Sequence, residues 1–265
     1  MKPLAQLAKA QAAKIRGVFL DIDDTLTSEG RLTATAYTAL ENLQRCGLLV
    51  APITGRPAGW CDHMARMWPV DAVVGENGAF YFRYEHDGRR MQRHFWLDAA
   101  QRAEDRRRLD KVKSEILSQV AGAAVSADQR YRECDLAIDF CEDVVPLSDE
   151  QVQHIVLLFE KAGAQAKVSS IHVNGWFGDY DKLSMTRRMM QECFDVDLDS
   201  CRDDYLFIGD SPNDGPMFQY FPLSVGVANI ERFRNQMSET PAFVTGAASG
   251  AGFAEAVSRI IESRA

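Results

Sequence analysis

The stretch "GVFLDIDDTLTSEG", residues 17–30, joins an apolar run directly to a cluster of carboxylates. Residues 18–20 are typical of a buried strand, and Asp21, Asp23 and Asp24 follow at once. Neighbouring carboxylates repel one another, and a buried charge is costly unless it is paired or bound to a metal. The stretch therefore indicates either a surface loop or a site that holds a positive partner.

Two more apolar segments end in polar residues. "LLVAPIT" (48–54) ends at Thr54, and "YLFIGD" (205–210) ends at Asp210. The segments alternate with predicted helices, which favours a parallel sheet of βαβ units. Ligands bind outside the carboxyl ends of such strands, so we expect Asp21, Thr54 and Asp210 to meet at one edge. The other elements expected in this part are helices at 33–46, 57–67, 182–193 and 251–263 and strands at 71–75 and 223–229.

The expected meeting point gathers further carboxylates. Asp21 and Asp23 are two residues apart, so an extended backbone points both side chains the same way. "GDSPND" (209–214) adds Asp214 beside Asp210. Oxygen ligands favour a hard cation, and few carboxylates with open positions favour Mg²⁺ over Ca²⁺. We therefore expect the positive partner to be Mg²⁺, with a lysine nearby.

The pattern changes in the middle of the chain, which we interpret as an α+β domain of residues 84–170 inserted into a Rossmann-like α/β core of residues 1–83 and 171–265. Its expected elements are a hairpin within 80–97, helices at 99–121 and 148–163, and strands at 135–140 and 166–173. The hairpin should turn at residues 87–88, because Asp-Gly favours a tight turn. Ser148 and Gln151 form a capping box that should begin the second helix.

Composition narrows the classes of partner. The 265 residues carry a net charge of -8, which disfavours nucleic acid and, more weakly, an anionic membrane surface. No apolar run approaches the roughly 20 residues of a membrane span. The six cysteines show no zinc spacing, which favours free thiols in the cytoplasm over a disulfide framework. The sequence gives no indication of the oligomeric state.

Four motifs carry a family resemblance. "DIDDTLT" (21–27), "ITGR" (53–56), "DKLS" (181–184) and "GDSPND" (209–214) resemble, in order, the motifs of the haloacid dehalogenase superfamily of phosphotransferases. The insert between the second and third motifs resembles the large cap of the Cof-type branch, as does "GENGA" (75–79) just before it. The resemblance implies a core of this superfamily with an inserted cap domain.

The resemblance also implies roles for the motif residues. Asp21 would be the nucleophile that forms an aspartyl-phosphate, and Asp23 the general acid and then the base. Thr54 and Lys182 would hold the phosphoryl oxygens. The implied Mg²⁺ ligands are Asp21, the backbone carbonyl of Asp23, and Asp210, with Asp214 and Asn213 supporting them. The implied substrate contacts are Thr54, Gly55, Arg56, Asn77 and Lys182.

Two features leave alternatives open. His172 and Asn174, where the insert returns to the core, could contact the leaving group or make structural hydrogen bonds at the hinge. Asp24 stands where this branch most often has glycine, and we expect it to face away from the metal. The expected function is a Mg²⁺-dependent phosphatase for a small phosphorylated metabolite, a phosphosugar or phosphopolyol. The alternatives are a phosphomutase and a protein that binds a phosphorylated ligand without turnover.

Overall fold

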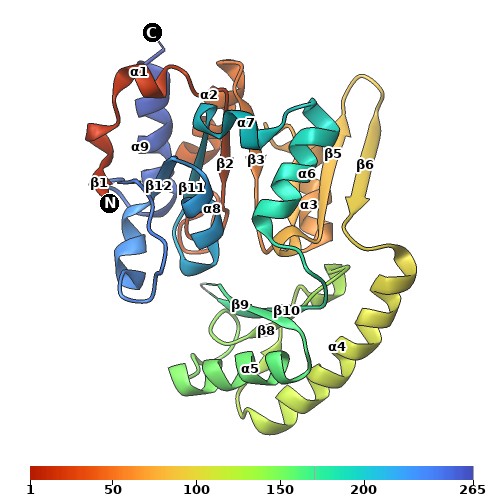
Figure 1. The fold of residues 1–265 in the computed structure, drawn as a ribbon. Coiled ribbons are helices and arrows are strands. Elements are labelled where there is room, and N and C mark those ends of the chain that lie inside the picture. Colours follow the sequence, from red (N-terminus) through yellow and green to blue (C-terminus); the bar gives the residue numbers. More distant parts are fainter. Residues whose placement is uncertain (170, 265) are drawn as a thin grey trace.

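The structure is a computed structural model that describes residues 1–169 and 171–264. Its central sheet has six strands in the order β1-β13-β12-β11-β2-β3, and every neighbouring pair is parallel (Figure 1). The bounds are β1 Lys2–Pro3, β2 Gly17–Leu20, β3 Leu49–Pro52, β11 Tyr205–Gly209, β12 Leu223–Gly226 and β13 Phe243–Val244. The parallel core predicted from the sequence is therefore confirmed.

Helices cover both faces of the central sheet (Figure 1). Val18 and Leu20 pack with α2 and α9, whereas Phe19 points to the opposite face with α6 and α8, because successive side chains of a strand alternate. The helices of the core are α1 Lys9–Ala12, α2 Ala34–Arg45, α3 Ala58–Met67, α6 Lys182–Phe194, α7 Leu198–Cys201, α8 Gly215–Tyr220 and α9 Ser249–Glu262. Across the two described ranges, no helix is long and apolar enough to cross a membrane.

A second sheet begins at the strand predicted at 71–75, which lies parallel to the chain after β3 and also pairs with an antiparallel neighbour. β4 (Val73–Gly75), β5 (Phe80–Glu85) and β6 (Arg90–Phe95) form an antiparallel sheet, with the predicted hairpin between β5 and β6. A single parallel bridge, Ile53 to Val74, links β4 to the chain after β3. Asn77 and Gly78 adopt positive φ angles and reverse the chain at once, so the next strand returns antiparallel.

The third sheet lies in the insert and corrects one strand prediction. Its order is β7-β8-β10-β9, and its pairs are antiparallel. The bounds are β7 Ala124–Val125, β8 Leu136–Asp139, β9 Gln165–Val168 and β10 His172–Trp176. The single strand predicted at 166–173 is two strands of a hairpin, although residue 170 lies outside the described residues. The Ser169 Oγ accepts hydrogen bonds from the backbone N–H groups of Ile171 and His172, which stabilise the turn.

The sheet of the insert faces the core, and its two helices pack on the outer side (Figure 1). These helices are α4 (Ala99–Gln119) and α5 (Asp149–Lys161), and the predicted capping box begins α5. The predicted insert boundaries, 84 and 170, stay a prediction. We propose that the insert runs from 99 to 176, because β5 and β6 pair with β4, whereas β10 pairs with β8 and β9. We call these residues the cap.

Candidate active site

Three polar side chains meet at the carboxyl edge of the central sheet. Asp21 follows β2, Asp210 follows β11 and Thr54 lies two residues beyond β3. The order β11-β2-β3 makes these strands neighbours, and all three side chains are buried. The topology thus brings together residues that are far apart in the sequence, at the place where open α/β sheets bind ligands.

Three carboxylates form a compact acidic cluster at this edge. Oxygen atoms of Asp21, Asp210 and Asp214 lie within 4.8 Å of one another. The Asp214 Oδ2 accepts a hydrogen bond of 3.1 Å from the Asp210 backbone N–H. At Gly209 a side chain would collide with the Asp214 carboxylate, so glycine allows this close approach. An all-oxygen set of buried carboxylates suits a hard divalent cation such as Mg²⁺.

Lys182 supplies positive charge beside the cluster. Its Nζ lies 2.8 Å from Asp21 Oδ1 and 2.7 Å from Asp214 Oδ1. Lys182 is the first residue of α6, and Asp181 caps this helix by accepting a hydrogen bond from the Ser184 N–H. Gly78, with φ of 109°, lies against the Asp181 carbonyl with no room for a Cβ atom. The "GENGA" turn therefore fixes the start of the helix that carries Lys182.

The ionisation of the cluster reflects this crowding. Burial raises the pKa of Asp21 to about 7, and the attraction of Lys182 offsets only part of this shift. Burial and the neighbouring Asp21 and Asp214 carboxylates raise the pKa of Asp210 well above its usual range. Burial opposes the charge of Lys182, but the two adjacent carboxylates raise its pKa overall, so it stays protonated. A divalent cation among the carboxylates would offset their mutual repulsion.

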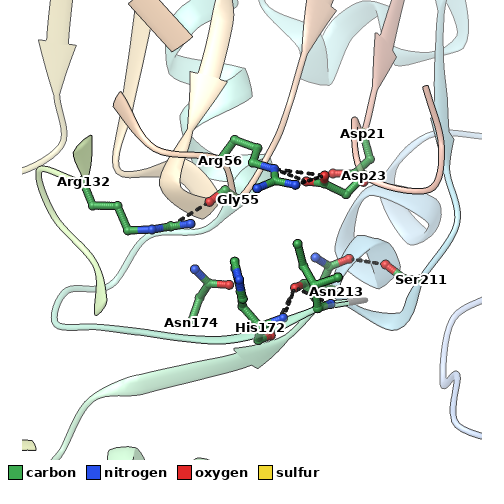
Figure 2. Close-up of a pocket in the computed structure, with 11 residues that line it drawn as sticks. Asp21, Asp23, Gly55, Arg56, Arg132, His172, Asn174, Ser211 and Asn213 are labelled. Carbon is green, nitrogen blue, oxygen red and sulfur yellow. Dashed lines mark hydrogen bonds and ion pairs between the residues drawn. The ribbon is translucent and has the colours of Figure 1, made fainter. Parts of the chain in front are cut away.

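Asp23 points its side chain toward Arg56 (Figure 2). The Arg56 Nε donates to both Asp23 carboxylate oxygens at 3.0 Å, and Nη2 donates to Oδ1 at 2.7 Å. Two carboxylates of the cap also reach Arg56, with Glu142 Oε1 at 3.3 Å and Asp128 Oδ2 at 3.6 Å. Burial alone would lower the pKa of Arg56, but these carboxylates raise it overall. Arg56 therefore links Asp23 to the cap.

A cavity of about 20 Å³ lies between the core and the cap and is lined by residues of both. Figure 2 shows Asp21, Asp23 and Arg56 on one side and His172 and Asn174 of β10 on the other. Both β10 side chains also have partners within the cap. The His172 Nε2 lies 2.8 Å from Glu142 Oε2, and the Asn174 amide donates to Asp135 Oδ2 at 2.9 Å. They thus line the cavity and are held by structural contacts at the same time.

Arg132 is a cap residue of the site that the sequence reasoning missed. Its Nε lies 3.0 Å from Asp128 Oδ1, its Nη1 lies 2.9 Å from Asp135 Oδ2, and Nη1 donates to the Gly55 carbonyl at 2.9 Å. The stretch "RECDLAID" (132–139) places charges on both sides of an apolar strand, the same signal that singled out Asp21. We call six cap residues the roof: Asp128, Arg132, Asp135, Glu142, His172 and Asn174.

Asn77 and Asp24 lie beside the cavity without lining it. Asn77 packs its amide against Gly55, and within the described residues its Nδ2 has no hydrogen-bond partner. It borders a neighbouring cavity together with Lys182. Asp24 has φ of 57°, a conformation that glycine adopts freely and aspartate tolerates. Its carboxylate lies 3.0 Å from Arg232, in a pair outside the cavity.

Glu76, in the "GENGA" turn, anchors the cap to the core through hydrogen bonds. It is fully buried, and its carboxylate accepts backbone N–H hydrogen bonds from three consecutive cap residues, Glu133, Cys134 and Asp135. A fourth N–H, from Ala58 at the start of α3, donates to the same carboxylate. Burial raises the pKa of Glu76 to about 7, and its two oxygens together accept all four of these N–H groups, so this one side chain orders the loop that carries the roof.

We expect Glu76→Gln to lower the free energy of unfolding by about 2–4 kcal/mol, because glutamine has one acceptor oxygen and leaves buried donors unpaired. Urea unfolding measures this loss, and amide hydrogen exchange at residues 133–135 should accelerate. Glu133→Gln is the control, since this neighbouring side chain is exposed. If Glu76→Gln lowers the free energy of unfolding by less than about 0.5 kcal/mol, the hydrogen bonds to Glu76 do not anchor the cap.

The comparisons with known proteins agree with this geometry. Residues 18–105 match the family described as haloacid dehalogenase-like hydrolase. The match covers about a third of the chain, and over that segment the chain is similar to the haloacid dehalogenase-like hydrolases. The matched segment contains Asp21, Asp23, Thr54 and the "GENGA" turn. None of the curated proteins matches this chain in sequence.

Solved structures share the fold over nearly the whole chain. A Thermoplasma acidophilum protein has a TM-score of 0.69 at 20% identity, with 93% of this chain and 98% of that chain covered. A HAD/COF-like hydrolase candidate from Plasmodium vivax has a TM-score of 0.69 at 16% identity, covering 96% and 99%. The sucrose-phosphatase of Synechocystis, solved with sucrose and phosphate, has a TM-score of 0.63 at 15% identity, covering 93% and 98%. The likeness at these identities is one of fold, core and cap included.

Proposed function

We propose that the protein is a Mg²⁺-dependent phosphomonoester hydrolase that acts on a small phosphorylated metabolite through an aspartyl-phosphate. The observation that carries this proposal is the cluster of Asp21, Asp210 and Asp214, with Lys182 held 2.8 Å from Asp21. The substrate proposed is a phosphosugar or phosphopolyol. The sucrose-phosphatase and a sugar phosphatase of HAD subclass IIB, which share the fold, support this choice.

The first chemical step would form a bond between an Asp21 oxygen and phosphorus. The bond between phosphorus and the ester oxygen breaks, and Asp23 gives its proton to the departing alkoxide. In the second step Asp23 takes a proton from water, which attacks phosphorus and releases inorganic phosphate from Asp21. Asp23 is thereby protonated again, and the balance of each cycle is ester plus water giving alcohol plus phosphate.

Three carboxylates, the Lys182 ammonium group and the metal would supply the charges around the phosphoryl group. Asp21, Asp210 and Asp214 would hold Mg²⁺, together with the backbone carbonyl of Asp23. When bound, the cation neutralises charge on the phosphoryl oxygens. Lys182 and Thr54 would hold those oxygens from the other side. Thr54 accepts a hydrogen bond from the Arg56 N–H, which leaves its hydroxyl proton available to a phosphoryl oxygen.

The cap would control access to this site. A cavity of about 20 Å³ has room for little more than one water molecule, so a phosphosugar cannot enter the described arrangement. The cap would have to move to admit the substrate and close again over it. Closure would exclude bulk water and bring the roof against the leaving group.

We expect activity on an aryl phosphate to fall by about 10²-fold or more in chelator and to return with added Mg²⁺. Release of nitrophenol from 4-nitrophenyl phosphate measures this dependence. The control is Asp210→Asn, which removes a proposed ligand and should raise the Mg²⁺ concentration needed for half-maximal activity. Full activity in chelator would contradict the assignment of the acidic cluster.

The binding-only alternative makes a different prediction. A protein that binds a phosphorylated ligand without turnover has no need of both Asp21 and Asp23 at the cavity. It would release no phosphate beyond one equivalent per chain. Steady release over many equivalents would support the hydrolase.

A further inference from the structure

The roof carries more negative than positive charge. Its carboxylates are Asp128, Asp135 and Glu142, whereas its cationic groups are the Arg132 guanidinium and the His172 imidazole. From the core, Arg56 forms a bidentate pair with Asp23, and the two charges cancel whenever Asp23 is ionised. The half of the site that would receive the leaving group is therefore acidic even when His172 is protonated.

Each cationic side chain that lines the cavity already has a carboxylate partner. Arg132 is shared between Asp128 and Asp135, and its side chain is 1% exposed. Arg56, 6% exposed, is shared among Asp23, Glu142 and Asp128. His172 faces Glu142 at 2.8 Å. Among the described residues lining the cavity, no cation lacks a carboxylate partner.

Two of the roof carboxylates, Glu142 and Asp128, are held in their charged form. The His172 imidazole, 2.8 Å from Glu142 Oε2, lowers the pKa of Glu142, and Arg56 adds to this effect. Burial opposes the charge of Asp128, but Arg132 lowers its pKa overall. Ionised carboxylates only accept hydrogen bonds, so they suit hydroxyl groups and repel anions.

We propose that the site selects phosphomonoesters whose leaving group is uncharged and hydroxylated, and that the roof excludes substrates with a second anionic group. This inference rests on the proposed function and narrows its substrate class. A carboxylate or second phosphate at the roof would have to break an existing ion pair or stay unpaired beside three carboxylates. A mutase cycle, which passes through a bisphosphorylated sugar, would meet the same obstacle.

The test compares phosphomonoesters that differ in one charge. The pairs are glycerol 3-phosphate with 3-phosphoglycerate, and glucose 6-phosphate with 6-phosphogluconate. We expect kcat/KM to favour the uncharged member of each pair by about 10- to 100-fold. Equal values, or a preference for the acid, would overturn the inference, whereas hydrolysis of 4-nitrophenyl phosphate tests the proposed function separately.

A binding measurement keeps the inference testable if turnover is absent. Calorimetry of the same pairs on the Asp21→Asn protein in Mg²⁺ should show the uncharged member binding at least tenfold tighter. Equal affinities would overturn the inference even if no substrate is hydrolysed.

Substitutions at two neighbouring carboxylates test whether the charge of the roof sets this preference. Glu142→Gln removes one roof charge, from a side chain that is 31% exposed, and should reduce the preference within each pair about 3- to 10-fold. Asp143→Asn removes an exposed charge one residue further along and should leave the preference unchanged. The same change in both variants, or none in either, would contradict the role of the roof.

Discussion

Asp21→Asn is expected to lower kcat/KM on 4-nitrophenyl phosphate by about 10⁴-fold or more, the scale on which catalytic nucleophiles act. The proposed mechanism has one nucleophile, at the end of β2, and an amide oxygen does not replace it. Lys182, itself paired with Asp214, lies 2.8 Å from the Asp21 carboxylate and holds it at the end of β2. Initial rates give the loss, and mass spectrometry of acid-quenched protein shows whether the phosphorylated chain forms.

Asp24→Asn is the matched control for Asp21→Asn. Asp24 lies in the same loop, but its carboxylate pairs with Arg232, and asparagine also tolerates its positive φ of 57°. We expect its activity to stay within about tenfold of the unaltered chain. Phosphorylation of the Asp21→Asn protein during turnover would show that another residue is the nucleophile.

The core half of the site could be predicted because a parallel sheet converts sequence pattern into position. Each apolar segment that ends in a polar residue becomes a strand with that residue at its carboxyl end, and neighbouring strands share one edge. Asp21, Thr54 and Asp210 follow this rule. Lys182 was assigned from its motif instead, and its contact with Asp21 depends on a turn, at Gly78, that pattern alone does not place.

The cap half was harder to predict, because its site residues act through contacts between distant segments. Arg56 was expected to contact substrate, yet in the structure it holds Asp23 and reaches two cap carboxylates. Those partners lie 72 to 86 residues away along the chain, at Asp128 and Glu142. Periodicity describes one element at a time, so it cannot pair charges across two domains.

The strand predicted at 71–75 is present, but its antiparallel neighbour was not foreseen, and the single strand predicted at 166–173 was wrong; both differences have local causes. The residues after β4 take positive φ angles that turn the chain back at once, and helix or strand periodicity carries no such information. In the 166–173 segment the Ser169 side chain accepts backbone hydrogen bonds and replaces a continuous strand with a turn. In both places a short backbone feature reverses the direction of the chain, and the apolar pattern does not reveal it.

Asp23→Asn is expected to separate two kinds of ester. An alkyl alkoxide is a poor leaving group and needs a proton from Asp23, so its hydrolysis should fall by about 10²- to 10⁴-fold. Nitrophenolate leaves without a proton, so phosphoryl transfer to Asp21 should persist with 4-nitrophenyl phosphate. The second step still needs a base, and the phosphorylated protein should therefore accumulate. Rapid mixing should show a burst close to one equivalent of nitrophenol, followed by slow release.

Arg56 makes the choice of control for this experiment important. It binds both oxygens of Asp23, so its loss would move Asp23 as well as alter charge. Arg56→Lys keeps the charge but loses the bidentate geometry, and we expect it to slow alkyl esters more than aryl esters, in the same direction as Asp23→Asn but by less. If Asp23→Asn slows both ester types equally and gives no burst, then Asp23 is not the proton donor. Its pairing with Arg56 would in that case serve to hold the cap on the core, and the general acid would have to be sought among the roof residues.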